Sequence, residues 1–302
     1  SGLAEGMRAP EMHPERVYWI ERRARSGGTP LVRFVSTPVD VTDVMQEAVY
    51  TPYKTVVFTS ATLSVNDSFS FWERRVGLDA VEADRREEHI FPSPFDYERR
   101  VLLGVPDDAP LPDSPEYQPF LSRFVSEALT LSEGRALVLF TSYEMLRITY
   151  ESVKPALTKL GITAFRQGDD ERSRLLEGFN TDTASVLFAT QSFWQGVDSP
   201  GETLTLLILC KLPFRVPTHP IQLARMEAIR REDGNPFRDL SLPDAVMRLK
   251  QGFGRLMRHR RDRGVVLIPD ARVVRKSYGS LFLNSLPSTA RSLKEAGRVV
   301  RD

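Results

Sequence analysis

Short, almost continuously apolar runs alternate with longer runs of helical periodicity over the larger part of the chain. The segments 136–140 and 186–189 carry no polar side chain, which is typical of strands buried on both faces of a parallel sheet. The pattern predicts helix 115–132, strand 135–141, helix 143–160, strand 162–166, helix 170–179, strands 184–190 and 203–210, helices 218–232 and 242–258, and strand 264–269. This order indicates an α/β fold, a parallel sheet with helices on both faces.

The beginning of the chain follows a different order. It predicts strands over 16–20 and 31–35, a helix over 41–50 with Asp40 as its N-cap, and a strand over 55–58. Residues 64–113 are rich in Pro, Asp and Arg and predict an irregular connector. We therefore expect a short first unit joined to a larger α/β unit.

Composition fits an ordinary globular protein. The chain has 302 residues, 41% of them hydrophobic and 27% charged, which is enough for about two domains. Lys and Arg number 41 against 40 Asp and Glu, so net charge does not indicate a nucleic-acid partner. Local clustering does, because five arginines fall within nine residues: Arg255, Arg258, Arg260, Arg261 and Arg263.

Cysteine and histidine usage argues against a metal held by protein side chains. The single cysteine, Cys210, lies in an apolar run and is expected to be buried and inert. The four histidines fall in no metal-ligand spacing.

No run approaches the ~18 apolar residues of a membrane span, and the start of the chain lacks the pattern of a signal peptide. We expect a cytoplasmic protein with no membrane partner, and a sequence that begins inside a longer chain.

The stretch from Gln251 to Arg258 carries the most specific candidate chemistry. On the predicted helix 242–258, helical spacing places Gln251, Arg255 and Arg258 on one face, opposite an apolar stripe. Guanidinium groups grip phosphate oxygens and offset the charge that develops as a γ-phosphate is transferred. The alternative is a solvated basic helix face.

Two further features of this helix bear on the hypothesis. Ser241 and Asp244 form a pair similar to a capping box and predict where the helix begins. Gly252 and Gly254 each cost a helix about 1 kcal/mol relative to alanine. Their presence indicates that a ligand, such as a polyphosphate, approaches the backbone closely.

Two polar turns also follow predicted strands, where parallel sheets gather ligands. Thr141 and Ser142 offer hydroxyls at a helix N-terminus, a position suited to a nucleic-acid phosphate. A plain N-cap explains Ser142 equally well. Ser60 and Thr62 lie in a small polar turn that is a weak signal when taken alone.

The loop 192–198 follows another predicted strand. Gly196 permits close backbone approach, and Asp198 is suited to orient arginines or a nucleotide hydroxyl. A tight turn with a capping aspartate is the alternative. Phe193 and Trp194 are expected to pack into the core rather than stack on bases.

Taken together and in order, these segments resemble the motifs of superfamily 2 helicases of the DinG/XPD type. The matches are residues 59–63 to motif III, 138–142 to motif IV, 192–198 to motif V and 251–258 to motif VI, and the segments 211–217 and 278–287 are similar to the bacterial DinG branch. The resemblance runs from about residue 16 to residue 287. Its specificity comes from four motifs in the family's order.

The resemblance implies a DNA translocase that moves 5′ to 3′ and has two RecA-like motor domains with ATP hydrolysed in the cleft between them. The implied nucleotide-site residues are Arg255 and Arg258 as arginine fingers, Gln251 beside them, and Gly196, Asp198 and Gly254. The implied contacts to single-stranded DNA are Thr141 and Ser142, with Ser60 and Thr62 linking hydrolysis to DNA grip. Gln195 stands where the family usually has glutamate, which leaves a hydrogen-bonding role but no acid role.

The chain departs from a complete motor, because it contains neither a Gly-x-x-x-x-Gly-Lys-Ser/Thr phosphate loop nor an Asp-Glu-x-His box. We expect residues 1–65 to be the C-terminal remnant of a first motor domain and residues 66–302 to be a whole second RecA-like domain, inactive alone. ATP and Mg²⁺ would then act in the full-length protein with the first motor domain in cis. An iron–sulfur cluster is possible only in that missing part.

Two other interpretations stay open at the level of sequence. In the first, the chain is a non-catalytic nucleic-acid binding or docking module whose arginine run tracks phosphates. In the second, the parent is a nuclease-linked relative. The chain has no carboxylate cluster for two metals, so a nuclease domain would lie elsewhere.

Overall fold

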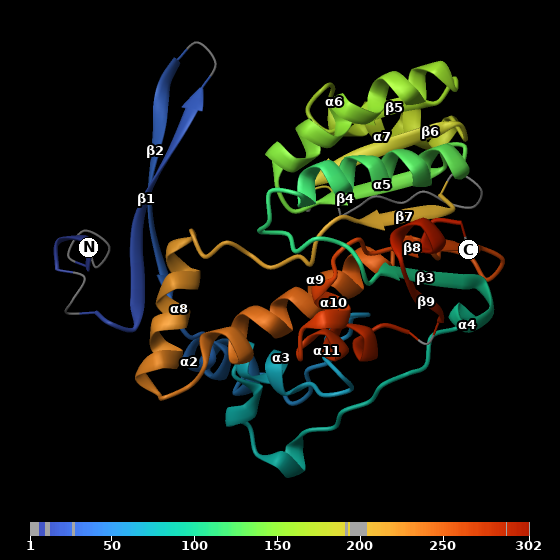
Figure 1. The fold of residues 1–302 in the computed structure, drawn as a ribbon. Helices are drawn as coiled ribbons and strands as arrows, with labels where there is room; N and C mark the ends of the chain where they lie inside the picture. The colour runs from blue at the N-terminus through green and yellow to red at the C-terminus, as the bar shows by residue number, and fades with distance from the viewer. Residues whose placement is uncertain are drawn as a thin grey trace. The chain divides into compact units, whose positions relative to one another are not determined.

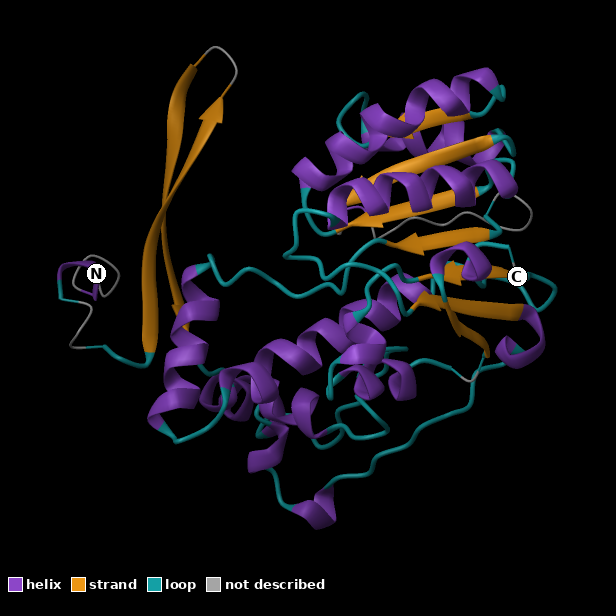
Figure 2. Cartoon of the chain, viewed as in Figure 1, coloured by secondary structure: helices purple, strands orange, loops and turns teal. Residues whose placement is uncertain are grey.

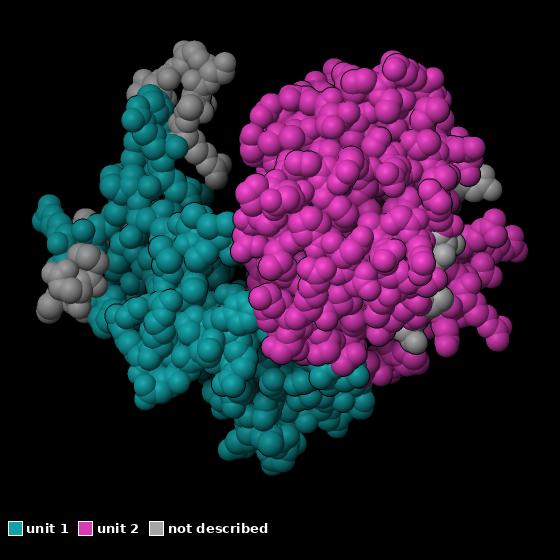
Figure 3. Space-filling view, viewed as in Figure 1, with its two compact units in different colours: residues 1–89, 215–244 teal, residues 90–214, 245–302 magenta. Residues whose placement is uncertain are grey.

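The computed structural model describes residues 6–9, 13–25, 28–190, 193, 204–287 and 289–301. The chain divides into two compact units (Figure 3). One unit combines residues 1–89 with 215–244, and the other combines 90–214 with 245–302. These units are not the predicted segments 1–65 and 66–302, whose assignment to two motor domains remains a proposal about the parent protein.

The larger unit is built on a parallel sheet, which confirms the predicted α/β class (Figure 2). In the described residues the sheet has seven strands in the order β5-β6-β4-β7-β8-β3-β9. The strands are β3 Val101–Pro106, β4 Ala136–Phe140, β5 Thr163–Arg166, β6 Ser185–Thr190, β7 Leu206–Leu209, β8 Gly264–Leu267 and β9 Ala290–Lys294. Every pairing between neighbours is parallel.

Helices cover both faces of this sheet (Figure 1). The long ones are α5 Tyr117–Leu131, α6 Tyr143–Lys159 and α7 Arg172–Thr181, and the short ones are α4 Tyr97–Arg100, α10 Arg272–Arg275, α11 Gly279–Ser285 and α12 Ala296–Val299. Helix α6 joins β4 to β5 across β6, whereas α7 joins β5 back to β6. Because such crossovers are right-handed, connections that run in opposite directions lie on opposite faces.

Strand β4 lies at the centre of the core. All five of its residues are buried, as its apolar composition predicts. The ring of Phe140 stacks on that of Phe188 in β6 with centroids 6.3 Å apart, and Tyr150 of α6 meets Phe188 edge-on at 5.3 Å. Burying each such side chain contributes about 1.5–3 kcal/mol, so the strands that carry the polar turns are rigidly held.

The smaller unit contains an antiparallel hairpin and several helices. Its elements are β1 Arg16–Arg25, β2 Gly28–Pro38, α2 Thr42–Met45, a π-helical turn Gln46–Tyr50, α3 Ser70–Arg75, α8 Pro220–Arg231 and a second π-helical turn Phe237–Ser241. The prediction that Asp40 is the N-cap of the first helix is wrong, because the N-cap of α2 is Val41. The Asp40 carboxylate instead accepts the N–H of Thr42, the first residue of α2, at 2.6 Å. Arg225 of α8 donates from Nε to the carbonyl oxygen of Val39 at 3.0 Å and ties α8 to the end of β2.

Two predicted features of the first unit and its connector are wrong. Residues 55–58 form no strand, and Val57 is 80% exposed. A strand needs a neighbour to satisfy its backbone groups, and no described strand pairs with this segment. The predicted connector 64–113 contains the buried strand β3, which the sequence pattern does not indicate because Arg99 and Arg100 precede it and Pro106 is its last residue.

Helix α9, Leu242–Phe253, differs from its prediction at both ends. Its first turn continues directly from the π-helical turn Phe237–Ser241, so Ser241 is not an N-cap. The cap is Asn235, whose side-chain oxygen accepts the N–H groups of Phe237 and Arg238 at 3.0 and 3.1 Å. At the other end the helix stops five residues before the predicted Arg258.

Candidate functional site

The arginine segment of the larger unit is a turn rather than a helix face. The N–H of Gly254 donates to the carbonyl of Lys250 at 2.9 Å, but that of Arg255 donates to Gly252 at 3.1 Å. The hydrogen bonds thus shift from a four-residue to a three-residue spacing, which ends the α-helix. Two glycines in this turn lower its helix propensity. The predicted alignment of Gln251, Arg255 and Arg258 on one helix face is therefore wrong.

The turn is nevertheless held in a defined conformation. The Asp262 carboxylate accepts the N–H groups of Arg258 and His259 at 2.8 and 2.7 Å. Leu256 and Met257 are 1% and 2% exposed and anchor the turn in the core. Arg255 and Arg258 are half-buried, and the Nε atoms of both are shielded from solvent. The stretch from Gly254 to Arg263, called the arginine loop below, therefore carries two half-buried arginines on a backbone that is held in place.

An aromatic pair stands beside this loop. The rings of Tyr97 and Phe253 lie 5.6 Å apart. Burial raises the pKa of the Tyr97 hydroxyl, while a hydrogen bond with Ser93 and the positive charge of Arg258 act to lower it. No motif or periodicity in the sequence indicates Tyr97, which lies in α4 before β3.

Gly254 follows the last residue of α9. A methyl group at this position would lie 3.4 Å from the carbonyl oxygen of Lys250, an ordinary contact. Packing within the described chain therefore does not require glycine here. This agrees with the hypothesis that the small residue serves a ligand rather than the core.

Thr141 and Ser142 lie at the carboxyl end of β4, as predicted. Ser142 is exposed and is the N-cap of α6, because its hydroxyl accepts the N–H of Met145 at 3.2 Å. The neighbouring Tyr143 donates its hydroxyl hydrogen to the carbonyl of Gln167 at 2.7 Å, which ties this edge to the end of β5. A helix N-terminus with an exposed hydroxyl is suited to hold a phosphate.

The arginine loop and this edge are separate. The loop precedes the amino end of β8, whereas Thr141 and Ser142 follow the carboxyl end of β4. The strands are parallel, so the structure does not bring the two arginines to the strand edge that carries the two hydroxyls. It assigns them to different ends of the larger unit.

The carboxyl ends of β7 and β8 hold a charged cluster that the sequence analysis missed. Asp270 is fully buried and accepts from the N–H of Leu212 at 2.9 Å and from Nε and Nη2 of Arg272 at 2.9 and 2.6 Å. The Arg272 guanidinium lies over the ring of Phe214, 5.4 Å from its centroid. The available signal was an Asp-x-Arg triplet directly after a buried strand.

Lys211 belongs to the same edge. Leu139 of β4 is opposite Leu209 of β7, so Thr141 and Lys211 each follow the paired ladder by two residues. Burial and the nearby Arg272 lower the pKa of Lys211. The register therefore adds a cation to the edge that carries Thr141 and Ser142.

The remaining predicted residues lie elsewhere. Ser60 and Thr62 belong to the smaller unit, where the exposed Ser60 hydroxyl accepts the N–H of Thr62 at 3.3 Å. Gly196 and Asp198 lie outside the described residues, as does Trp194. Phe193 is 5% exposed, with the guanidinium of Arg172 over its ring at 5.0 Å, so the prediction that it packs is confirmed.

Two further features are absent from the described residues, a metal-binding cluster and a membrane-spanning helix. No group of three or more His, Cys, Asp or Glu side chains is placed to hold a metal ion. Within the same residues, every helix is too short or too polar to cross a bilayer.

Comparisons with known proteins give consistent matches. A family model described as the helicase C-terminal domain matches residues 125–289. The chain is 38% identical over 288 residues to the ATP-dependent DNA helicase YoaA of Escherichia coli (strain K12), covering 95% of this chain and 43% of YoaA. It is 35% identical over 284 residues to a Bacillus subtilis (strain 168) protein named 3′-5′ exonuclease DinG, covering 92% and 30% respectively.

A solved structure, S. tokodaii Xpd4, superposes with a TM-score of 0.57 at 17% identity and covers 87% of this chain and 49% of that one. This likeness shows a shared fold. The chain spans less than half the length of these relatives.

Proposed function

The chain belongs to the helicase C-terminal domain family of the DinG/XPD type, and on that premise we propose that it is the second motor domain of an ATP-dependent DNA helicase. In this proposal residues 1–65 are the end of the first motor domain and residues 66–302 are the second. The full-length protein hydrolyses ATP with Mg²⁺ and translocates 5′ to 3′ on single-stranded DNA. The phosphate loop and the magnesium-binding residues come from the part of the first motor domain that this chain lacks.

The observation that carries the proposal is the fixed arginine loop. Arg255 and Arg258 sit half-buried on a turn closed by Asp262. A partly buried guanidinium on a backbone that is held in place loses less entropy on gripping a phosphate, and it stabilises charge as it develops. The turn projects two such groups without requiring a helix face. Gln251, in the last turn of α9, and Gly254 complete the proposed contact with the nucleotide, together with Gly196 and Asp198.

The DNA track is proposed at the carboxyl ends of β4 and β7. Thr141 and Ser142 supply hydroxyls and the free end of a helix, and Lys211 supplies positive charge. Such contacts position the backbone without reading bases, as a motor that moves along any sequence requires. Ser60 and Thr62 are proposed to link DNA grip to hydrolysis from the smaller unit.

The isolated chain is expected to hydrolyse no ATP, with or without DNA, because it lacks the groups that cradle the phosphates and hold magnesium. Phosphate release measured with oligothymidylate present would test this, with the full-length protein as the positive control. DNA-stimulated turnover that copurifies with the isolated chain through several columns would contradict it.

Replacing Lys211 with glutamine in the full-length protein is expected to weaken single-stranded DNA binding. The slope of log Kd against log salt should fall by about 0.7, the loss of one phosphate contact. Lys159→Gln, an exposed lysine at the far end of α6, is the matched control and should leave the slope unchanged. Equal slopes for both variants would mean that Lys211 does not contact the DNA backbone.

The same titration separates the motor from a passive docking module. A motor should bind DNA with an affinity that changes between ATP-bound and ADP-bound states and weakens when Thr141 and Ser142 are both replaced by alanine. Binding that ignores the nucleotide and both hydroxyls would favour the docking module.

A further inference from the structure

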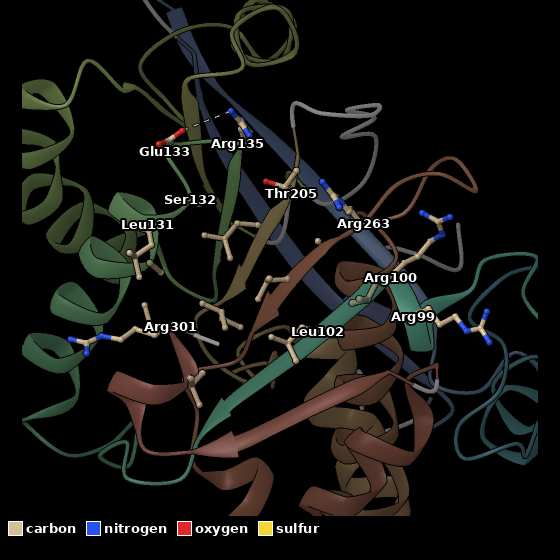
Figure 4. A pocket seen from close by; sticks show the side chains of 18 of the residues that line it. Arg99, Arg100, Leu102, Leu131, Ser132, Glu133, Arg135, Thr205, Arg263 and Arg301 are labelled. Atoms are coloured by element: carbon tan, nitrogen blue, oxygen red, sulfur yellow. Dashed lines mark ion pairs between the residues drawn. The ribbon is translucent and has the colours of Figure 1, made fainter.

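A groove of about 880 Å³ lies in the larger unit at the amino ends of its central strands (Figure 4). It runs between the C-terminal ends of α5 and α12, over β3, β7 and β8. Its floor is aliphatic: Leu102, Ala128, Leu206, Val265, Leu267, Val299 and Val300. Leu131, at the end of α5, adds an apolar side chain that is 59% exposed.

The rim of the groove is positive. Five arginines line it against two glutamates: Arg99, Arg100, Arg135, Arg263 and Arg301 against Glu98 and Glu133. Figure 4 shows Arg301 at one end, Arg99 and Arg100 at the other, and Arg135 and Arg263 along a third side. The Glu133 carboxylate lies 4.0 Å from the Arg135 guanidinium and offsets the positive charge of that arginine alone. The occupant that suits this rim carries negative charge.

The groove borders the arginine loop through Arg263, the last residue of that loop, but it is not lined by the described residues proposed to contact nucleotide or DNA. None of the described nucleotide or DNA residues lines it, neither Gln251, Arg255 and Arg258 nor Thr141 and Ser142. Single-stranded nucleic acid is bound by positive charge together with aromatic side chains on which bases stack. Every apolar side chain among the described lining residues is aliphatic. The lining therefore favours an apolar side chain over a base.

We propose that this groove docks an acidic peptide segment of a partner protein, with one or two apolar residues anchored on the aliphatic floor and flanking Asp or Glu residues paired with the arginine rim. Leu131 provides the anchor contact at the edge of the floor. Arg135 and Arg301, on different sides of the groove, provide charge contacts to the residues on either side of the anchor. Buried apolar anchors give such contacts their affinity, and the surrounding charges give specificity and association rate.

The test uses the full-length protein and a fluorescein-labelled synthetic peptide with two leucines flanked on each side by three aspartates. Fluorescence anisotropy at low salt should show saturable binding. The double variant Arg135→Glu/Arg301→Glu should weaken it about tenfold or more through loss of two exposed ion pairs and new repulsion. Arg123→Glu, an exposed arginine on α5 outside the groove, is the control and should bind as the wild type does.

The floor is tested separately. Leu131→Ser should weaken binding of this peptide, and an all-aspartate peptide of equal length should bind the wild type much less tightly. Retained ATP hydrolysis and an unchanged melting temperature establish that each variant is folded. Arg99→Glu, at another exposed arginine of the rim, replaces the double variant if that one fails to fold.

Three results would overturn the proposal. The first is absence of saturable binding. The second is equal binding of the all-aspartate peptide, which would leave no role for the floor. The third is displacement of the peptide by oligothymidylate that binds through Arg135 and Arg301, which would make the groove a nucleic-acid site.

Discussion

Replacing Arg258 with alanine in the full-length protein is expected to lower kcat for ATP hydrolysis by about 10³-fold or more, the effect of removing an arginine finger. The guanidinium would act mainly on charge that develops as the γ-phosphate bond breaks, so most nucleotide binding should remain. The backbone of this residue is fixed by Asp262 and its neighbour Met257 is buried. The loop should therefore keep its conformation when the side chain is shortened.

Two further variants sharpen this experiment. Arg258→Lys keeps one positive charge but loses the planar fork that grips two oxygens, and it should restore little activity. Arg260→Ala removes an exposed arginine from the same loop and should leave kcat within about twofold, since surface substitutions away from a site have small effects. Steady-state turnover and the affinity for a labelled nucleotide are measured for each.

Normal turnover in Arg258→Ala would remove the principal site assignment. A raised KM with unchanged kcat would instead mean that Arg258 binds the ground state and the transition state equally. Loss of nucleotide binding as severe as the loss of turnover would also contradict a transition-state role.

The sheet was predictable because several of its strands are buried on both faces. Strand β4 and most of β6 consist of apolar residues without interruption, and burial on both faces leaves few other environments for such segments. Strand β3 is buried at five of its six positions, but it follows two arginines and ends on a proline. Arginines and a proline around a short apolar run are typical of a connector, so the local sequence does not predict this strand.

The end of α9 shows a second limit of sequence patterns. Apolar residues recur at helical spacing through Phe253 and Leu256, yet the chain leaves the helix between them. The apolar periodicity continues to Leu256 because this side chain is also buried, although its backbone belongs to a turn and not to the helix. Spacing predicts which side chains are buried, and it does not by itself fix the backbone that buries them.

The candidate site was predictable only where its polar residues directly follow a strand in the sequence. Thr141 and Ser142 could be found in this way. Lys211 could not, because its place beside Thr141 depends on the register of β7 against β4. The pairing of Asp270 with Arg272 and with the N–H of Leu212 joins segments far apart in sequence, and such contacts exist only once the sheet is assembled.

This last cluster is expected to dominate the stability of the larger unit at the carboxyl ends of its strands. Asp270→Ala should lower the free energy of unfolding by about 3–5 kcal/mol, because it leaves the partly buried guanidinium of Arg272 without its counter-charge. It also leaves the N–H of Leu212 without its carboxylate acceptor. Urea unfolding followed by circular dichroism measures this as a lower midpoint at an unchanged slope.

The control for this prediction is Asp170→Ala, which breaks an exposed pair with Arg174 at 3.4 Å and should cost at most about 1 kcal/mol. The double variant Asp270→Leu/Arg272→Met should recover much of the loss, since replacing a buried ion pair by apolar residues is often neutral. A cost below about 1 kcal/mol for Asp270→Ala would mean that Arg272 turns to solvent when its partner is removed. In that case the phosphate edge formed by Thr141, Ser142 and Lys211 would draw its rigidity from β4 and β7 themselves rather than from the buried carboxylate.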